Sequence, residues 1–176
     1  MRSVDQWLAY ARARSVQEIQ RALPMLGTSW VNTIAADREG QAMYTDVSVV
    51  PNVDDAMLKD CAPSPQAAAL LRSAAGIVVL DGSKAACNWK VDPASPVPGL
   101  TPMQRMPLAV RSDWVHNSND SFFYTNPAQK FDGIGFMVGD DVVRRPRTRA
   151  GLVEVPELVA RGPVTLEAAQ KQLFSN

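Results

Sequence analysis

The sequence predicts an α+β fold, because patterns with helical spacing occupy both ends of the chain and short strand patterns lie between them. At 176 residues the chain is expected to form one domain, and 46% hydrophobic against 20% charged residues is typical of a globular protein. Two proline-rich stretches, 47–66 and 88–109, show little periodicity, and loops of that length are uncommon inside small domains. We therefore expect them to lie over a larger body.

The N-terminal part of the chain carries two helix signals. Apolar residues at helical spacing predict a helix over residues 3–14. Ser15, followed three positions later by Glu18, is a capping-box pattern, and it predicts that a second helix begins here. Gly27 is expected to end that helix, because glycine is favoured just after a helical C-terminus.

Short strands and further helices are expected in the rest of the chain. A turn at residues 37–40, which ends in glycine, predicts a hairpin between the two strand patterns on either side of it. The predicted strands comprise residues 30–36, 41–46, 76–80, 110–117 and 122–125. The further predicted helices comprise residues 67–73, 156–161 and 165–174, and Gly162-Pro163 separates the last two.

The charge balance restricts the kinds of partner. Basic and acidic residues number 18 each, so the net charge is zero, and neither nucleic acid nor an anionic membrane surface is expected as a partner. No apolar run approaches the roughly 20 residues that a membrane-spanning helix needs. The first residues lack the apolar stretch of a signal peptide, so we expect no export signal within this sequence.

The sequence offers little for nucleophilic, metal or cofactor chemistry. Its single histidine, His116, has no Gly-x-Ser-x-Gly motif to supply a serine, and we interpret it as a strand residue with a satisfied ring. The only Gly-x-Gly segment, Gly133-Ile134-Gly135, is too short to bind phosphate, and no cofactor is expected. Cys61 and Cys87 lack Cys-x-x-Cys spacing, so they could form a disulfide or remain two buried thiols.

The densest polar motif is Asn117-Ser118-Asn119-Asp120-Ser121, which follows a predicted strand. An asparagine amide held rigidly at a strand end is a neutral hydrogen-bond donor, and acyl transfer needs such a donor to stabilise a developing oxyanion. The alternative for Asn119 is a turn residue that is bonded to nearby backbone. The arginine run at 144–149 is either a solvated helix start or the source of one inward-facing arginine that orients a catalytic centre.

Three segments together resemble the penicillin acylase family. They are residues 30–40 (Trp-Val-Asn-Thr-Ile-Ala-Ala-Asp-Arg-Glu-Gly), residues 81–89 (Asp-Gly-Ser-Lys-Ala-Ala-Cys-Asn-Trp) and the Asn-Ser-Asn-Asp-Ser motif at 117–121. The spacer between the last two segments, with Pro98-Gly99-Leu100 and Met106-Pro107, is similar as well. The resemblance covers essentially the whole chain, and it is to the branch with acyl-homoserine-lactone acylases and aculeacin A acylase.

The resemblance implies an N-terminal-nucleophile hydrolase with a four-layer αββα sandwich. In that family an exported precursor cleaves itself at a Gly–Ser bond into α and β chains, and the new N-terminal serine attacks an amide with its own amine as base. Residues 1–176 then form a single partial domain from the interior of the β chain, so the sandwich is incomplete and the chain alone is expected to be inactive. The Gly82-Ser83 bond lies inside a β-chain motif, and no self-cleavage is expected there.

The resemblance also assigns catalytic roles to individual residues. Asn119 matches the oxyanion-hole asparagine of the family. A downstream arginine orients that asparagine, and the spacing favours Arg147, with Arg149 as the competitor. Some family members bind a structural calcium ion; Asp132 is the nearest candidate ligand, but no metal site is predicted in this chain.

Further residues match the substrate pocket and the cysteine pattern of the family. Trp30 and Val31 match positions that line the acyl pocket, and Trp7 matches another such position. An apolar, aromatic-lined cleft suits a fatty acyl chain. Cys61 and Cys87 match a bridged pair, which favours the disulfide over two free thiols.

The partners implied by the resemblance are a small acyl amide substrate, the missing α chain and the remaining β-chain segments. Lactone, lipopeptide and β-lactam substrates all stay open at this point. The complete precursor would be periplasmic or secreted. The competing hypothesis is a truncated, non-catalytic relic or a partner-binding fragment.

Overall fold

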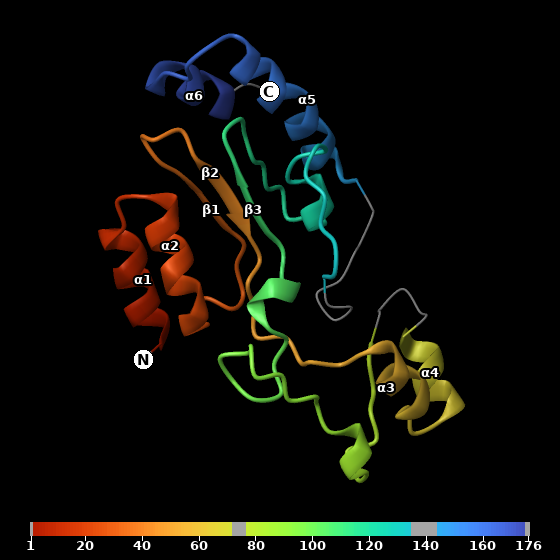
Figure 1. Ribbon diagram of the computed structural model, residues 1–176. Helices are drawn as coiled ribbons and strands as arrows, with labels where there is room; N and C mark the ends of the chain where they lie inside the picture. Colours follow the sequence, from red (N-terminus) through yellow and green to blue (C-terminus); the bar gives the residue numbers. More distant parts are fainter. Residues whose placement is uncertain (1, 72–76, 135–143, 175–176) are drawn as a thin grey trace.

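The computed structural model describes residues 2–71, 77–134 and 144–174 and confirms an α+β fold, with helices around one small antiparallel sheet (Figure 1). The sheet contains β1 (Thr33–Ala36), β2 (Ala42–Thr45) and β3 (Leu108–Arg111), in the order β1-β2-β3. β1 and β2 are consecutive, whereas β3 reaches β2 from far along the chain. The sheet therefore joins the N-terminal part to the segment that carries the asparagine motif.

Two helices precede the sheet, as the sequence predicts. They are α1 (Arg2–Arg12) and α2 (Val16–Ala22), and α2 continues into the 3₁₀ turn η1 (Leu23–Met25). The Ser15 hydroxyl accepts a hydrogen bond from the Glu18 backbone N–H at 3.3 Å, which confirms the predicted cap. The Glu18 carboxylate accepts from the Arg14 N–H, one residue before the position that a capping box normally uses.

The predicted helix end at Gly27 is wrong, and this glycine serves another purpose. The chain turns at Leu26, whose backbone adopts the left-handed conformation with φ 49°. A side chain at position 27 would overlap the backbone carbonyl of Arg2. Only glycine therefore lets the loop pass this close to the start of α1.

The hairpin turn at 37–40 is confirmed, although both of its strands are shorter than predicted. Asp37 organises this turn, because one carboxylate oxygen accepts from the Gln41 N–H at 2.9 Å and the other accepts from the Val16 N–H at 3.0 Å. The bond from Val16 is the largest cause of the lowered pKa of Asp37, and the bond from Gln41 is the next. One carboxylate thus fixes the hairpin and ties the start of α2 to it.

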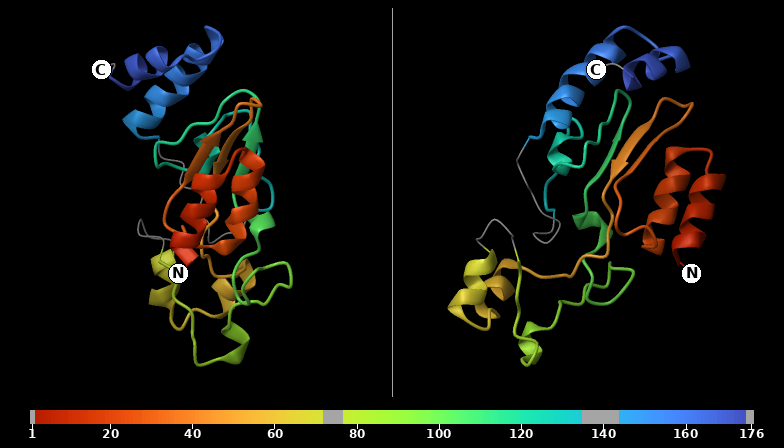
Figure 2. Two further views of the ribbon diagram at one scale, coloured as in Figure 1. Left: turned by 90° about the vertical axis from the view of Figure 1, so that its left-hand side faces the viewer. Right: turned by 180° about the vertical axis from the view of Figure 1, so that it is seen from behind.

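The two faces of the sheet are covered by different parts of the chain. Ile34, Tyr44 and Ala109 lie opposite one another across the three strands and share one face, where Tyr44 and Ala109 are buried against Phe122. Met43 points to the other face and is also buried. The views in Figure 2 place α1 and α2 along one side of the sheet and the segment after β3 on the other side.

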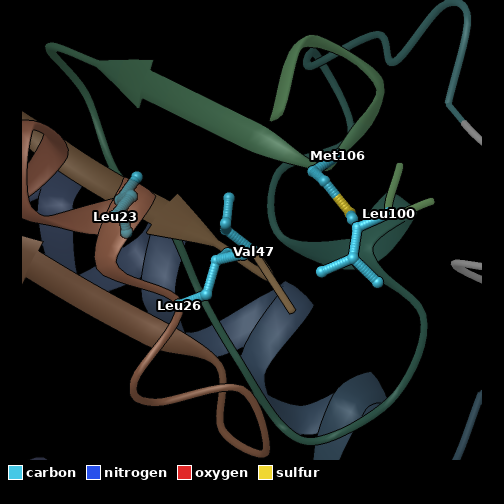
Figure 3. Close-up of a cluster of buried hydrophobic side chains, with 5 residues drawn as sticks. All are labelled: Leu23, Leu26, Val47, Leu100 and Met106. Carbon is cyan, nitrogen blue, oxygen red and sulfur yellow. The ribbon is translucent and has the colours of Figure 1, made fainter. Parts of the chain in front are cut away.

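A cluster of five buried side chains packs the end of α2 against both proline-rich stretches (Figure 3). It comprises Leu23, Leu26, Val47, Leu100 and Met106. Burial of side chains of this size contributes about 1.5–3 kcal/mol each. The two proline-rich stretches are therefore held to each other and to the end of α2 by this cluster. The 3₁₀ turn η3 (Met103–Arg105) lies beside it.

Cys61 and Cys87 form a disulfide, as the resemblance implies. The bridge joins the chain just after α3 (Asp55–Asp60) to the 3₁₀ turn η2 (Ala85–Cys87). Both cysteines are buried with Val53 and Met57 in a second small cluster. This part lies at the opposite end of the molecule from the C-terminal helices (Figure 1).

Three elements in this part differ from the sequence-based prediction. α3 lies in a stretch that was expected to be loop, and Asp54 caps it by accepting from the Met57 N–H at 3.1 Å. α4 (Pro65–Leu71) covers most of the predicted helix at 67–73, of which residues 72–73 lie outside the described ranges. The strand predicted at 76–80 is wrong for residues 77–80, which are irregular, and residue 76 is not described.

The C-terminal part consists of α5 (Pro146–Ala160) and α6 (Leu166–Leu173), at one end of the molecule (Figure 1). α6 agrees with the predicted helix at 165–174. α5 begins at Pro146 rather than at Pro156, because Pro156 lies inside the helix and does not start it. Within the described ranges, no helix is both long enough and apolar enough to cross a membrane.

The disulfide is expected to contribute substantially to stability. The double replacement Cys61→Ser with Cys87→Ser should lower the free energy of unfolding by about 3–4 kcal/mol, because the bridge spans 26 residues and restricts the unfolded chain. Urea denaturation of both proteins measures the difference. Reduction with dithiothreitol should lower the free energy of unfolding of the wild type to that of the variant. Equal stability of the oxidised and reduced wild type would contradict the prediction.

Candidate functional site

The asparagine motif does not follow a strand directly, so the strand predicted at 110–117 is wrong beyond β3, which ends at Arg111. Arg111 donates two hydrogen bonds to Asp113, at 2.6 and 2.7 Å, and Asp113 also accepts from the Trp114 N–H at 2.7 Å. The bond from Arg111 is the main reason that the pKa of Asp113 falls to about 2. This local ion pair turns the chain away from the sheet.

One side-chain amide and one backbone hydrogen bond take the place of the expected strand ladder after this turn. The strand predicted at 122–125 is wrong, and the 3₁₀ turn η4 (Phe122–Tyr124) takes its place. Asn126, which is buried, donates through its side chain to the Trp114 carbonyl at 2.9 Å. The His116 N–H donates to the Thr125 carbonyl at 2.9 Å. The two segments therefore run together, and the motif forms the loop that connects them.

The His116 ring links the motif loop to η4 through two hydrogen bonds. The ring is buried, its Nδ1–H donates to the Tyr124 carbonyl at 3.1 Å, and its Nε2 accepts from the Ser118 hydroxyl at 2.8 Å. The prediction of a satisfied ring is confirmed, although His116 does not lie in a strand. Sequence reasoning found no serine–histidine pair, and the pair present here differs from a catalytic triad because a backbone carbonyl, not a carboxylate, holds the second ring nitrogen.

Asn119 occupies an uncommon backbone conformation at the tip of this loop. Its φ is 57°, in the left-handed region that asparagine tolerates better than most residues. The Asn119 N–H donates to Asn117 Oδ1 at 2.9 Å, an Asx turn that stabilises this conformation. The side chain of Asn119 is exposed, so its amide can meet a ligand at the surface.

Arg147 contacts the Asn119 side chain across 28 positions of sequence. Its Nη2 donates to Asn119 Oδ1 at 3.3 Å, and Nη1 of Arg145 donates to the Asn119 backbone carbonyl, also at 3.3 Å. No hydrogen bond between Arg149 and Asn119 is found in the structure that is described. With Oδ1 taken, the Asn119 NH₂ group is the donor that remains, and it has no acceptor among the described residues.

Asp120 holds the first turn of α5 beside the motif. Its side chain is only 2% exposed, and one carboxylate oxygen accepts from the Arg145 N–H at 2.9 Å and from the Thr148 hydroxyl. The other oxygen lies 3.1 Å from Arg145 Nη1, as an ion pair without hydrogen-bond alignment. The Thr148 bond, followed by the Arg145 N–H, lowers the pKa of Asp120. A negative charge at a helix N-terminus also suits the helix dipole.

The predicted acyl-pocket residues form an exposed apolar surface. The Trp7 and Trp30 rings meet edge to face, with centroids 6.4 Å apart, and they are 55% and 62% exposed. Val31, which follows Trp30 in the sequence, is exposed as well. Gln6 brings α1 to this place, because its buried Oε1 accepts from the Gly27 and Thr28 N–H groups at 2.5 and 3.1 Å.

The structure thus brings Asn119 together with Arg147, and Trp7 together with Trp30, while their catalytic and substrate-binding roles stay predictions. Sequence reasoning missed Asp120 as the residue that holds α5. A signal for it exists, since Arg145 precedes the helix and makes no side-chain cap of its own, so the cap must come from elsewhere. In the described parts of the chain, no three His, Cys, Asp or Glu side chains lie close enough to share a metal ion.

The comparisons with known proteins cover most or all of the chain. The family model described as penicillin amidase matches residues 1–176. The acyl-homoserine lactone acylase PvdQ of Pseudomonas putida KT2440 is 42% identical over 138 residues, which are 78% of this chain and 17% of that protein. PvdQ of Pseudomonas syringae pv. syringae B728a is 35% identical over 179 residues, with 99% of this chain and 22% of that protein covered. Aculeacin-A acylase of Actinoplanes utahensis is 37% identical over 161 residues, with 90% and 20% covered. The chain therefore spans about a fifth of the length of the curated relatives that it matches.

Gly151 of α5 is expected to resist the substitution that usually strengthens helices. Gly→Ala inside a helix normally adds roughly 1 kcal/mol of stability. A methyl group at position 151 would instead overlap the His116 ring, so Gly151→Ala should lower the free energy of unfolding by about 1–3 kcal/mol. Gly82→Ala faces open space and is the control, with little expected change. Urea denaturation decides, and a stabilised Gly151→Ala protein would show that the ring does not pack here.

Asp120→Asn should loosen α5, because the amide keeps the size of the side chain but loses the charge that Arg145 and the helix N-terminus need. The melting temperature should therefore fall at neutral pH. Folding lowers the pKa of Asp120 below its usual 3.8, so the contribution of the charge is complete above about pH 4 and is lost as the pH falls through the folded-state value.

The gap in melting temperature between wild type and Asp120→Asn should accordingly shrink over that acidic range. Asp132→Asn, which changes an exposed aspartate, provides the control at each pH. Equal melting temperatures for the two variants at neutral pH would rule out a special role for Asp120.

Proposed function

The chain belongs to the penicillin amidase family, and we propose that it is the part of an amide hydrolase that supplies the oxyanion donor and an acyl-binding surface. The proposal rests on one observation above all. The Arg147 guanidinium donates to Oδ1 of Asn119, which leaves the NH₂ group of the same exposed amide as a neutral donor without an acceptor among the described residues. A donor of this kind stabilises the negative oxygen of a tetrahedral intermediate.

The attacking group is proposed to lie outside this chain. In the proposed reaction the N-terminal serine of a β chain attacks the amide carbonyl, and its own amine takes the hydroxyl proton. The carbonyl oxygen gains a negative charge and accepts from the Asn119 NH₂ group. The chain would then be an interior part of that β chain, built into a four-layer αββα sandwich with the α chain and the rest of the β chain. Support comes from the share of the relatives that it spans, about a fifth.

The proposed substrate is an amide with an apolar acyl chain, such as an acyl-homoserine lactone or a lipopeptide. Trp7, Trp30 and Val31 offer an exposed apolar surface, and each methylene of an acyl chain that it buries is worth about 0.8 kcal/mol. The names of the relatives, acyl-homoserine lactone acylase and aculeacin-A acylase, support this class of substrate. The Cys61–Cys87 disulfide supports an oxidising compartment, so the complete protein is proposed to be periplasmic or secreted.

A second candidate function is that of a partner-binding fragment without catalysis. The observation that favours it is the exposed apolar side chains of the last helix and its end, where Leu166, Leu173 and Phe174 are each more than three-quarters exposed. Surfaces of this kind mark contacts with other polypeptides. Hydrolysis by a protein that contains this chain would decide between the two candidates.

The test is to replace the matching segment of the Pseudomonas putida relative with this chain and to measure acyl release from an acyl-homoserine lactone. Asn119→Ala in that chimera should lower kcat by about 10²–10³-fold, because one oxyanion donor is lost, while KM changes little. An active chimera that keeps its kcat after Asn119→Ala would refute the proposed role. A chimera that folds but never releases acyl chains would favour the partner-binding candidate.

Arg147→Ala and Arg149→Ala form a matched pair for the same assay. Both remove one arginine from the same turn region of α5, but only Arg147 contacts Asn119. We expect kcat to fall for Arg147→Ala and to stay close to wild type for Arg149→Ala. The reverse order would transfer the orienting role to Arg149.

A further inference from the structure

Two other asparagines join the exposed tryptophan surface to Asn119. The Asn117 Oδ1 atom that accepts from the Asn119 N–H also accepts from Nδ2 of Asn32, at 3.4 Å. Asn32 Oδ1 in turn accepts from the Tyr44 hydroxyl at 3.0 Å. A continuous chain of hydrogen bonds therefore runs from the middle of the sheet, through both amides, to the backbone of Asn119.

Tyr44 gives this chain of hydrogen bonds a fixed end. It lies in β2 and is buried against Phe122. Burial, and then the nearby charge of Asp46, raises the pKa of its hydroxyl, so the group stays protonated and continues to donate. Because Asn32 directs Oδ1 toward Tyr44, its NH₂ group is the part that faces Asn117.

Asn32 stands next to the apolar surface in sequence and faces the motif loop with its side chain. It follows Trp30 and Val31 directly and precedes β1, so all three share one short connection. The side chains of Trp30 and Val31 are exposed, whereas the Asn32 amide is bonded at both ends. A shift of this connection when an apolar ligand settles on the surface would be passed to Asn117 through one hydrogen bond.

We infer that Asn32 is a positioning residue that couples the acyl-binding surface to the backbone of Asn119, so that the fit of the acyl chain affects the chemical step as well as binding. This inference rests on the proposed function. Asn119 needs its left-handed backbone to present its amide, and the Asn117 side chain secures that conformation. Asn32 orients Asn117, and an acyl chain that holds Trp30 and Val31 in place thereby holds the oxyanion donor in place.

The coupling predicts a division between kcat and KM. In the chimera with the Pseudomonas putida relative, a long acyl chain that covers Trp30 and Val31 should give a higher kcat than a short one. Asn32→Asp keeps the size of the side chain and the oxygen that accepts from Tyr44, but it removes the donor to Asn117. We expect it to lower kcat for the long chain by about fivefold or more, which corresponds to one net hydrogen bond, and to bring kcat for the two chains together.

A second measurement follows the backbone of Asn119 without any catalysis. Amide hydrogen exchange by NMR on the 176-residue chain should be faster at Asn119 in Asn32→Asp than in the wild type, because Asn117 is no longer held. Tyr44→Phe should have the same effect in the same direction, since it frees the other end of Asn32. Asn88→Asp makes the same chemical change at an exposed position and should alter neither measurement.

The outcomes separate this inference from the proposed function. Faster exchange at Asn119 together with a loss of the kcat difference between long and short chains supports the coupling. Unchanged exchange in Asn32→Asp overturns it, and so does faster exchange with the kcat difference intact. A folded wild-type chimera that shows no turnover refutes the proposed function, and the exchange rates then decide by themselves whether Asn32 positions Asn119.

Discussion

The buried carboxylate of Asp120 is the constraint on which the arrangement of the site depends. α5 begins at Arg145-Pro146 without a cap of its own, and Asp120 supplies the missing acceptor from the motif loop. A carboxylate that is 2% exposed is costly to bury unless its oxygens are satisfied. The loop and the helix therefore order each other: Asp120 needs the Arg145 N–H and the Thr148 hydroxyl, and the helix needs the carboxylate. Arg147 lies between those two residues and is brought to Asn119 as a consequence.

All polar groups of Asn119 except one donor have a hydrogen-bond partner. Its N–H is bonded to Asn117, its carbonyl accepts from Arg145, and its side-chain oxygen accepts from Arg147. The left-handed backbone and these three bonds fix the direction of the last group, the side-chain NH₂. Preorganisation of this kind matters because a donor that must first reorient loses much of its value for a developing charge.

The sequence was sufficient for the local elements and insufficient for those that depend on distant partners. The cap at Ser15 and the turn at Asp37 follow from neighbouring residues, and both were predictable. The strand predicted up to Asn117 failed because the Arg111–Asp113 pair turns the chain, which alternation of apolar residues does not reveal. The start of α5 was missed for a similar reason, since its cap lies 25 positions upstream.

The same division holds for the candidate site. Residues within a motif could be predicted from the sequence, whereas contacts between distant segments could not. Asn119 could be chosen from its motif, and Arg147 from the spacing of the family resemblance. The pairing of Trp7 with Trp30 depends on the buried Gln6, whose bonds to the loop at Gly27 no periodicity indicates. Spacing alone could not decide whether Cys61 and Cys87 form a disulfide or remain free thiols, and the resemblance was needed to favour the disulfide.

The residues proposed to touch substrate are exposed, while Gln6 and Asp120, which position the segments that carry them, have buried side chains. This division bears on how the acyl chain acts. Trp7, Trp30 and Asn119 lie at the surface, whereas Gln6 and Asp120 are buried. A neutral donor in open water is weak, because water competes for the same oxyanion and the high dielectric constant screens the charge. Under the proposed function, an acyl chain on the tryptophan surface excludes that water from the neighbourhood of Asn119. The same apolar contact that binds the substrate would then strengthen the donor that Asn32 and Asn117 hold in place, and substrates with short acyl chains would lose rate as well as affinity.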